Sequence, residues 1–372
     1  MLKAAELAFQ NLRSKPTRNL LLATIVALAV ATALTLFVLA DSIKEGLRAG
    51  SDERGADLTI SQRDAADLLS GYVPIDLEPR LAIIPGVAAV SGELVMFAPV
   101  DRLQSIVVGW TSNAYFWRQL PLSAGRLPKE ADDHPAILGS GIAESLKKRV
   151  GSNIEIFGES FNVIGLAGYS SAMNRSMIIL RVQDLENLSM RRGQVTAFHL
   201  ALRRNQSPTD VTQIKEKIQA MGKLTVSPTD QLLANDRNYR FLQAVSRAIS
   251  MIAFIMGSLS AFSTLLMAVT ERRREIGILM ALGWSDISIR ATILFEGIII
   301  GLLGGVLACP LVLLASLLFR HLPGIGDILS FRLSAGMVAL GLAGSAFFCA
   351  IGSLYPAVLS TRLIPSQVLR AP

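Results

Sequence analysis

The chain has 372 residues, of which 51% are hydrophobic and only 17% are charged, and its mean hydropathy is +0.46. Soluble domains usually carry about a quarter charged residues, so this composition excludes an ordinary soluble protein and indicates a membrane protein with a sizeable water-exposed part. The net charge of +7 does not gather on a soluble face, because residues 41–240 contain 23 Lys and Arg against 23 Asp and Glu. Nucleic-acid binding needs a clustered basic surface, so we expect no nucleic-acid partner.

The first 19 residues read as a basic amphipathic segment. Their apolar residues recur at helical spacing on one face, which predicts an interfacial helix on the inner membrane surface at 1–19. Pro16 then permits a turn into the first span. The alternative is an ordinary frayed terminus. The apolar face comprises Leu2, Ala5, Phe9 and Leu12, and the basic residues are Lys3, Arg13, Lys15 and Arg18.

Four stretches are apolar over the ~20 residues that are needed to cross ~30 Å of hydrocarbon. We predict transmembrane helices at 20–40, 244–269, 291–319 and 334–359. Most of the excess basic charge lies beside these spans. The positive-inside rule then places both termini and the segment 270–290 in the cytoplasm of a multi-pass inner or plasma membrane protein.

This topology places residues 41–243 and a short loop at 320–333 outside the cytoplasm, with a cytosolic tail at 360–372. A cleaved signal peptide at 1–40 is the alternative for the N-terminus. It is disfavoured because the apolar run of about 20 residues exceeds the ~7–15 of signal peptides.

Between the first two spans the pattern is mixed α/β. The predicted fold class is therefore an integral membrane α-helical protein with four transmembrane helices and a large mixed α/β extracytoplasmic domain inserted between the first and second spans. Two continuous helical stalks, with Gly46 as a weak point, are expected to carry this domain. Alternation predicts a β-hairpin at 153–164 and strands at 58–61, 105–110, 176–182 and 196–202, and helices fit 142–149 and 209–221.

The sequence holds no GxxxxGK[ST] loop, so it cannot cradle a nucleoside triphosphate in that way. The stretch Gly168–Ala172 nearly matches the GxSxG nucleophile elbow but is better explained as a polar loop. The adjacent Asp132 and Asp133 fit a solvated loop better than a metal site. We expect no catalytic residue, no metal site and no cofactor on this chain. The histidines are scattered without ligand-like spacing (His134, His199 and His321).

Small residues form stripes at helical spacing in two of the predicted spans, which lets helices approach closely in lipid. The alternatives are packing within one subunit and a seam between two subunits. Glu296 lies about a turn inside the third span, and such a carboxylate is either functional or placed at the inner interface opposite the arginines of the preceding loop. The stripes are Gly297, Gly301 and Gly305 in the third span and Ala23, Ala27 and Ala31 in the first.

The stretch ERRREIGILMALGWS, Glu271–Ser285, combines arginines with an apolar ridge that includes Ile276 and Met280. We interpret it as a short helix, parallel to the membrane, that docks into a groove on a cytosolic partner. Arginine pairs bidentately with carboxylates, which gives such docking register and affinity. The alternative is a basic anchor to anionic lipid headgroups, and it leaves the ridge without a role.

The same stretch and the span after it, ERRREIGILMALGWSDISIRATILFEGIIIGLLGG, resemble the coupling segment and third span of MacB/FtsX/LolC-type ABC transporter permeases. The resemblance covers nearly the whole chain and is weakest across 55–120 and 170–230. Residues 122–127, 136–139 and 150–165 resemble the family's extracytoplasmic core domain, and residues 11–20 and 355–370 are similar to its two ends.

The resemblance implies a dimer with a second copy or a paralogous subunit, and a separate cytosolic ABC ATPase dimer that carries the ATP and Mg. It also implies mechanotransmission, in which the ATPase pulls on the coupling helix and the stalks move the outer domains. By motif, the ATPase contact falls on Glu271, Arg272, Arg273, Arg274, Glu275, Gly277, Leu282 and Gly283.

The function implied in this way is export or extraction of an amphiphilic substrate, such as a lipid, lipoprotein, peptide or drug. A membrane-fusion or periplasmic protein would be a further partner. The alternative within the family is an FtsX-like signalling subunit that activates a cell-wall hydrolase without transport, and the length of the outer region favours transport. A membrane-anchored hydrolase would require a catalytic constellation that the sequence lacks.

Overall fold

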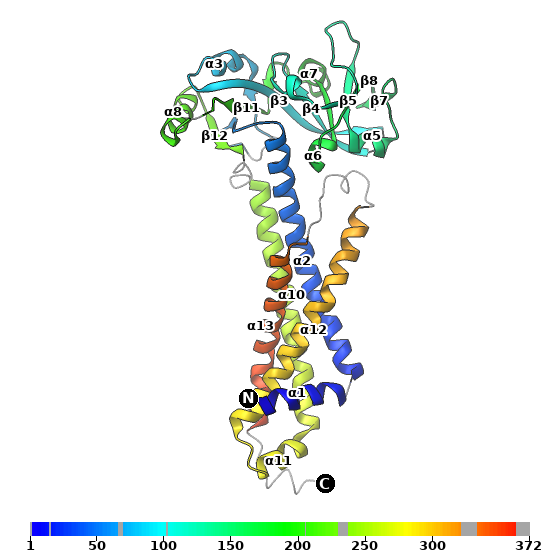
Figure 1. The fold of residues 1–372 in the computed structure, drawn as a ribbon, viewed down its shortest axis with the longest axis vertical. Helices are drawn as coiled ribbons and strands as arrows, with labels where there is room; N and C mark the ends of the chain where they lie inside the picture. Colours follow the sequence, from blue (N-terminus) through cyan, green and yellow to red (C-terminus); the bar gives the residue numbers. More distant parts are fainter. Residues whose placement is uncertain are drawn as a thin grey trace. The chain divides into compact units, whose positions relative to one another are not determined.

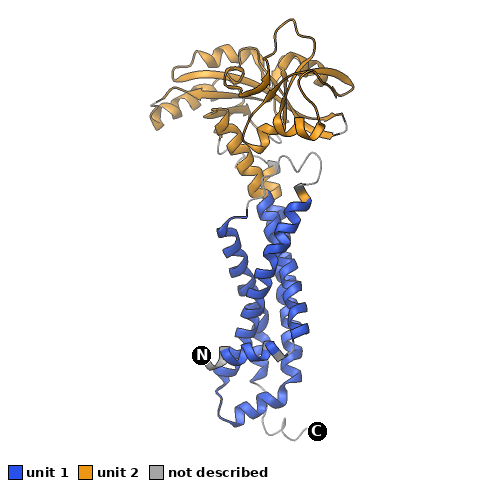
Figure 2. Ribbon diagram, turned by 45° about the vertical axis from the view of Figure 1, so that its right-hand side comes forward, with its two compact units in different colours: residues 1–39, 243–318, 331–372 blue, residues 40–242, 319–330 orange. Residues whose placement is uncertain are grey.

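The computed structural model describes residues 2–14, 16–65, 70–101, 103–204, 206–229, 237–320 and 333–361. The chain folds into two compact units (Figure 2). Unit 1 comprises Met1–Leu39, Gln243–Leu318 and Phe331–Pro372, and unit 2 comprises Ala40–Leu242 and Phe319–Ser330. Most of the predicted loop 320–333, most of the predicted tail 360–372 and the start of the second predicted stalk lie outside the described residues.

Unit 1 is built from long helices, as the apolar stretches predict. Four helices of the described chain are long and apolar enough to cross a membrane, which confirms the predicted number of spans. These four run side by side, while α1 crosses one end of the bundle and α11 lies at the same end (Figure 1). The helices are α1 (Leu2–Ser14), α2 (Pro16–Glu53), α10 (Arg237–Glu271), α11 (Arg273–Ala281), α12 (Asp286–Arg320) and α13 (Ala335–Ser360).

The bounds of these helices follow local sequence signals. Pro16 is the first residue of α2, where its missing N–H leaves no helical hydrogen bond unmade. α2 continues to Glu53 without interruption at Gly46, which confirms the predicted helical continuation of the first span. The N–H of Met337 donates to the hydroxyl of Ser334, which caps α13. The last part of the predicted segment 270–290 belongs to α12.

The glycine stripe of α12 packs against α13 within the chain. A Cβ built on Gly301 would lie 2.6 Å from the carbonyl oxygen of Ser345, and one built on Gly297 would lie 2.7 Å from the hydroxyl of Ser353. Gly305 approaches the same face of α13. The two helix backbones are therefore as close as glycine allows, and for this stripe the structure favours packing inside one subunit.

The alanine stripe of α2 is also buried inside the bundle. Ala23, Ala27 and Ala31 are at most 6% exposed. Gly304 of α12 lies against Val26 and against the carbonyl oxygen of Ala23. The small residues of α2 thus bring it close to α12, as those of α12 bring that helix close to α13.

Replacing Gly301 with alanine should loosen the contact between α12 and α13. The new Cβ would lie 2.6 Å from a backbone oxygen of α13, so one helix must shift, and we expect a loss of about 1–3 kcal/mol of stability. Gly336→Ala is the matched control, because its Cβ would meet no atom closer than 3.9 Å. Thermal unfolding in detergent should show a lower midpoint for Gly301→Ala only, and equal midpoints would contradict the close packing.

Unit 2 is a mixed α/β domain built on a ten-stranded sheet. The strand order is β12-β1-β11-β3-β4-β9-β6-β8-β5, and β7 pairs with β3 and β8. β4 is parallel to β9 and β6 is parallel to β8. The strands are β1 (Leu58–Gln62), β3 (Val87–Val100), β4 (Leu103–Trp110), β5 (Leu122–Gly125), β6 (Pro135–Gly139), β7 (Asn153–Ile156), β8 (Glu159–Ala167), β9 (Met177–Arg181), β11 (Ala197–Leu202) and β12 (Leu224–Pro228), with β2 (Val73–Pro74) and β10 (Gln194–Val195) in a small second sheet.

Alternating side chains give the sheet two cores. In β4, Val107 points into a core that also holds apolar residues of α3, α7 and α8, whereas Val108 and Trp110 point into a second core that includes α4. A strand with both faces buried needs apolar residues at nearly every position, as β4 shows. The helices are α3 (Glu78–Ala82, preceded by the short η1, Ile75–Leu77), α4 (Phe116–Gln119), α5 (Ser140–Leu146), α6 (Ala172–Arg175), α7 (Val182–Ser189) and α8 (Pro208–Gln219).

Several predicted elements of this domain are confirmed. β7 and β8 form the predicted hairpin, with Asn153 opposite Asn162. β1, β4, β9 and β11 lie where alternation predicts strands, and α8 lies where a helix is predicted. The predicted helix 142–149 is shorter, because Lys147 takes a left-handed conformation that ends α5. The long strand β3 at the centre of the sheet is not among the predicted elements.

Candidate coupling site

A break after α10 makes α11 a separate short helix. Arg272 leaves the helical conformation between the two helices. Gly283 has a φ of +89°, a left-handed conformation that glycine adopts without steric cost, and it follows the end of α11. The N–H of Ser288 then donates to the hydroxyl of Ser285 at 3.4 Å, so Ser285 caps α12.

Arg272 faces inward and joins three helices. Its guanidinium lies 3.7 Å from the carboxylate of Glu296 in α12 and donates to the backbone oxygen of Asn11 in α1 at 3.3 Å. The side-chain amide of Asn11 donates to the same carboxylate at 2.6 Å. The side chains of Arg272 and Glu296 are only 14% and 10% exposed, so each charge needs its partner. Glu296 therefore lies opposite an arginine of the loop, as one of the two alternatives predicts.

A second ion pair lies beside the first. Arg18 of α2 donates to the carboxylate of Glu271, the last residue of α10, at 3.1 Å. Both side chains are partly exposed, and because solvent screens the attraction between them, this ion pair contributes less to stability than a buried pair at the same distance. The start of α11 is nevertheless tied by side chains to α1, α2 and α12.

The apolar ridge of α11 packs inside the chain. Ile276 is 8% exposed and belongs to one cluster with Val269 of α10 and with Ile289 and Ile293 of α12. Met280 packs against the same cluster. The interpretation of this ridge as a docking face is therefore wrong for Ile276, which neighbouring helices cover, whereas Met280 is only partly covered.

A cavity of about 320 Å³ lies between α1, α10, α11 and α12. Most of its wall is apolar, with Leu7, Leu279 and Trp284 among the lining side chains. The charged groups in the wall include Arg272 and Glu296, which pair with each other. The cavity therefore offers chiefly apolar contact.

Other residues of α11 are exposed, although Ile278 also lines the cavity. Ile278 is 44% exposed and Leu282 is 73% exposed, and Arg273 and Arg274 are exposed beside them. Arg274, Ile278 and Leu282 follow one another at four-residue spacing, so they lie along one face. We call Arg273, Arg274, Ile278 and Leu282 the outer surface of α11. Such a surface can place an apolar side chain in a small hollow while its guanidinium groups pair with carboxylates.

The structure thus divides the eight residues that the resemblance assigns to an ATPase contact. Some of them anchor α11 to the bundle or are buried beneath it, and the others are exposed. The first group is Glu271, Arg272 and Gly277, and the second is Arg273, Arg274, Glu275, Leu282 and Gly283.

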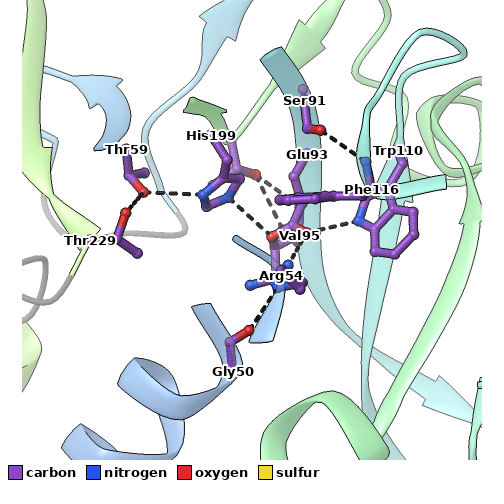
Figure 3. A network of polar contacts seen from close by, with 12 residues as sticks. Gly50, Arg54, Thr59, Ser91, Glu93, Val95, Trp110, Phe116, His199 and Thr229 are labelled. Atoms are coloured by element: carbon purple, nitrogen blue, oxygen red, sulfur yellow. Dashed lines mark hydrogen bonds and ion pairs between the residues drawn. The ribbon is translucent and has the colours of Figure 1, made fainter. Parts of the chain in front are cut away.

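A second charged cluster lies inside unit 2 (Figure 3). Thr59, His199, Glu93 and Trp110 belong to the neighbouring strands β1, β11, β3 and β4. In the strand register Thr59 is opposite His199, and Glu93 is opposite Trp110. Arg54, the residue after α2, reaches this row and forms an ion pair with Glu93. The cluster therefore joins the end of a long helix to the middle of the sheet.

Glu93 is only 3% exposed, and its partners keep it ionised. Burial alone would raise its pKa, but the charge of Arg54 and the hydrogen bonds from His199 and Trp110 outweigh burial and hold the pKa of Glu93 at about 2. The Trp110 indole donates at 2.8 Å. His199 lies 3.4 Å from the carboxylate and 3.1 Å from the hydroxyl of Thr59. The two buried charges, Arg54 and Glu93, thus pair with each other, as buried charges require.

The sequence gives little sign of this cluster. The available signal is a single acidic residue, Glu93, within the otherwise uncharged run Val87–Val100, and Arg54 shortly after the first span. Neither residue indicates its partner, because the two are 39 positions apart. His199 is expected to be solvated or packed rather than a ligand, and its exposure of 6% shows that it is packed.

The stability that Glu93 contributes should disappear in acid. Because its folded-state pKa of about 2 lies below the ordinary value of 4.5, this contribution is complete above about pH 4.5 and is lost as the pH falls toward 2. We expect a loss on the order of 3 kcal/mol over this range. Glu93→Gln should be less stable at pH 7, because it leaves Arg54 without a charged partner, and should show a flatter pH dependence. Unfolding midpoints followed by tryptophan fluorescence measure this, and parallel curves would contradict it.

Comparison with protein-family models matches two segments of the chain. Residues 20–221 match the MacB-like periplasmic core domain, and residues 247–365 match the FtsX-like permease C-terminal domain. The first segment covers most of α2 and most of unit 2, and the second covers most of α10 and all of α11, α12 and α13. The first match therefore contains Arg54 and Glu93, and the second contains Arg272 and Glu296, whereas Asn11 and Arg18 lie before both matches.

Curated relatives are similar over much of the chain. An uncharacterized ABC transporter permease of Methanocaldococcus jannaschii is 26% identical over 267 residues, which are 67% of this chain and 65% of that protein. The macrolide export ATP-binding/permease protein MacB of Bdellovibrio bacteriovorus is 25% identical over 63% of this chain and 38% of its own length. The pyoverdine export ATP-binding/permease protein PvdT of Pseudomonas fluorescens is 28% identical over 80% and 48%. The chain thus spans between about a third and two thirds of these relatives.

Among solved structures, the periplasmic region of MacB from Actinobacillus actinomycetemcomitans matches with a TM-score of 0.40 and 13% identity, over 50% of this chain and 95% of that one.

Proposed function

Because the chain belongs to the family of MacB-like and FtsX-like ABC transporter permeases, we propose that it is the permease subunit of a transporter driven by a separate ATP-binding subunit. Closure of the ATP-binding subunits pulls on the outer surface of α11, and the helices pass this movement to the α/β domain of unit 2. Two relatives are named for export of a macrolide and of pyoverdine. These names support an amphiphilic substrate, such as a lipid, lipoprotein, peptide or drug.

The observation that carries this proposal is the division of α11 into an anchored side and an exposed side. The exposed side offers Arg273, Arg274 and Leu282 to a partner. The anchored side is held by the packing of Ile276 against neighbouring helices and by the ion pair of Arg272, the residue just before α11, with Glu296. A force on the exposed side therefore acts on the whole bundle rather than bending a free loop.

Charge supports the orientation that this mechanism needs. Residues 270–290 carry four Arg against three acidic residues, whereas residues 41–240 are neutral. We place α11 in the cytoplasm and the α/β domain on the other side of the membrane, in keeping with the positive-inside rule. ATP-binding subunits then reach α11 directly.

Reversing the charge of the outer surface should break the complex. Arg273→Glu with Arg274→Glu replaces two donors by acceptors, and the loss of charge-assisted hydrogen bonds is expected to lower recovery of an ATP-binding subunit about tenfold or more on co-purification. Arg203→Glu with Arg204→Glu is the matched control, because these consecutive arginines are exposed in unit 2. Unchanged recovery with the α11 variant would count against docking at this surface.

Accessibility to an impermeant thiol reagent should differ between α11 and the α/β domain. In a chain whose Cys309 and Cys349 are replaced by alanine, we introduce Leu282→Cys at the end of α11 or Lys217→Cys in α8, both at exposed positions. In intact cells only the cysteine at 217 should react, and permeabilised cells should label both. Labelling of the cysteine at 282 in intact cells would place α11 outside and end the proposal.

A further inference from the structure

The end of α2 is attached to the α/β domain through its backbone, at contacts that all lie within unit 2. The carbonyl oxygen of Gly50 accepts a hydrogen bond from the side-chain amide of Asn174 at 2.9 Å and another from Nε of Arg54 at 3.3 Å. Asn174 belongs to α6 and is completely buried. The last turn of α2 is thus held against α6 by a group that cannot turn away into solvent.

A second attachment comes from Glu53, the last residue of α2. One carboxylate oxygen accepts from the hydroxyl of Ser170 at 2.9 Å and from the N–H of the same residue. The other accepts from the hydroxyl of Ser171 at 2.7 Å, from its N–H at 3.2 Å and from the amide of Asn174 at 3.0 Å. The loop that nearly matches a nucleophile elbow therefore uses both serine hydroxyls to hold a helix end. Charge-assisted bonds of this kind are about twice as strong as neutral ones.

A third attachment comes from Arg54, which points in a different direction, into the core between the sheet and α4 (Figure 3). It is 3% exposed, pairs with Glu93 of β3 and lies 5.1 Å from the centre of the Phe116 ring. The hydroxyl of Tyr115, also at α4, donates to the backbone oxygen of Gly55 at 3.2 Å. Two consecutive residues thus bind different elements: Glu53 binds α6 and the loop before it, and Arg54 contacts β3 and α4.

We propose that Glu53 and Arg54 form a rigid joint that fixes α2 to the α/β domain against rotation and tilt. A helix held at one point can swing, and the hydrophobic effect by itself favours no particular rotation of a helix, because it has no direction. Attachments on two sides, made by directional hydrogen bonds, prevent both movements. Glu53 and Arg54 are positioning residues, and their part in transport rests on the function proposed above.

Stability alone does not account for the ion pair in this joint. A buried pair can often be replaced by apolar side chains of similar volume at little cost, because bringing charges out of water offsets most of their attraction. Its best-attested role is to fix register, since only one arrangement satisfies both charges. Arg54 paired with Glu93 defines one orientation of the helix end in this way.

The rigidity of the joint can be measured on the full-length chain alone. Spin labels on cysteines replacing Lys44 of α2 and Lys217 of α8, in a chain lacking native cysteines, report the distance between helix and domain at two exposed positions. The joint variant combines Glu53→Ala with Arg54→Met and Glu93→Gln, so that no unpaired charge is left in the core. Asp52→Ala is the matched control, because this neighbouring carboxylate is exposed and pairs only with Arg48 of the same helix among the described contacts.

We expect one narrow distance distribution for the unsubstituted chain and for Asp52→Ala, and a distribution at least twice as wide for the joint variant. Tryptophan fluorescence must still show one cooperative unfolding transition in that variant. If the joint variant loses this transition, two single variants, Glu53→Ala and Glu53→Gln, are measured in its place. Glu53 lies outside the core cluster, so neither substitution disturbs the core. An equally narrow distribution in a folded variant overturns the joint.

A second measurement separates the joint from the transport function. In the complex with its ATP-binding subunit, labels at Lys217 and at Gly336 of α13 should report a change in distance when ATP is added. The joint variant should keep its ATP hydrolysis rate within about twofold, the tolerance set by ~0.4 kcal/mol, and lose this change. A variant that moves as the unsubstituted chain does overturns the joint. If the unsubstituted chain itself does not move, the proposed function fails, and the label distances in the isolated chain still decide the joint.

Discussion

Pairing of a buried arginine with a buried glutamate is the interaction on which both units depend. Arg272 and Glu296 form such a pair in unit 1, and Arg54 and Glu93 form one in unit 2. Removing one partner leaves an uncompensated charge that costs about 3–5 kcal/mol, so neither side chain can leave alone. Because both arginines lie directly after a long helix, each pair fixes the place where that helix ends.

The pair in unit 1 acts on helices that are closely packed behind it. Gly297 follows Glu296, and the space beside it is filled by Ser353 and the backbone of α13. One turn further along, Gly301 brings the two backbones equally close. A displacement of Arg272 therefore reaches α12 at the point where this helix cannot slide against α13 without a clash. The glycines hold α12 closely against α13, and the ion pair of Arg272 with Glu296 connects these two helices to the start of α11.

Hydropathy and the spacing of apolar residues predict where most helices and strands lie, but the surfaces that these elements pack against are visible only in the structure. Length and hydropathy are enough to find the four spans, and alternation is enough to find the hairpin of β7 and β8. The strand β3 escapes this approach because its central residues are buried on both faces and Gly92 and Pro99 interrupt the pattern. The ridge of α11 was misassigned for a related reason. An apolar stripe such as that of Ile276 shows that a face is covered, but not whether the cover is a partner or a neighbouring helix.

The distribution of contact types along α2 follows from what each type can do. Within unit 1, its buried residues are mostly small and apolar, such as Ala27 and Val30, and these contacts bring the helix close to its neighbours. At its end, Glu53 and Arg54 replace them with hydrogen bonds, whose energy falls steeply when donor and acceptor are misaligned. A helix that only anchored a domain would need no such alignment, since apolar packing alone would keep the two together. Directional contacts concentrated at the helix end are what the proposed joint requires, since hydrogen bonds and ion pairs define one angle between the last turn of α2 and the α/β domain.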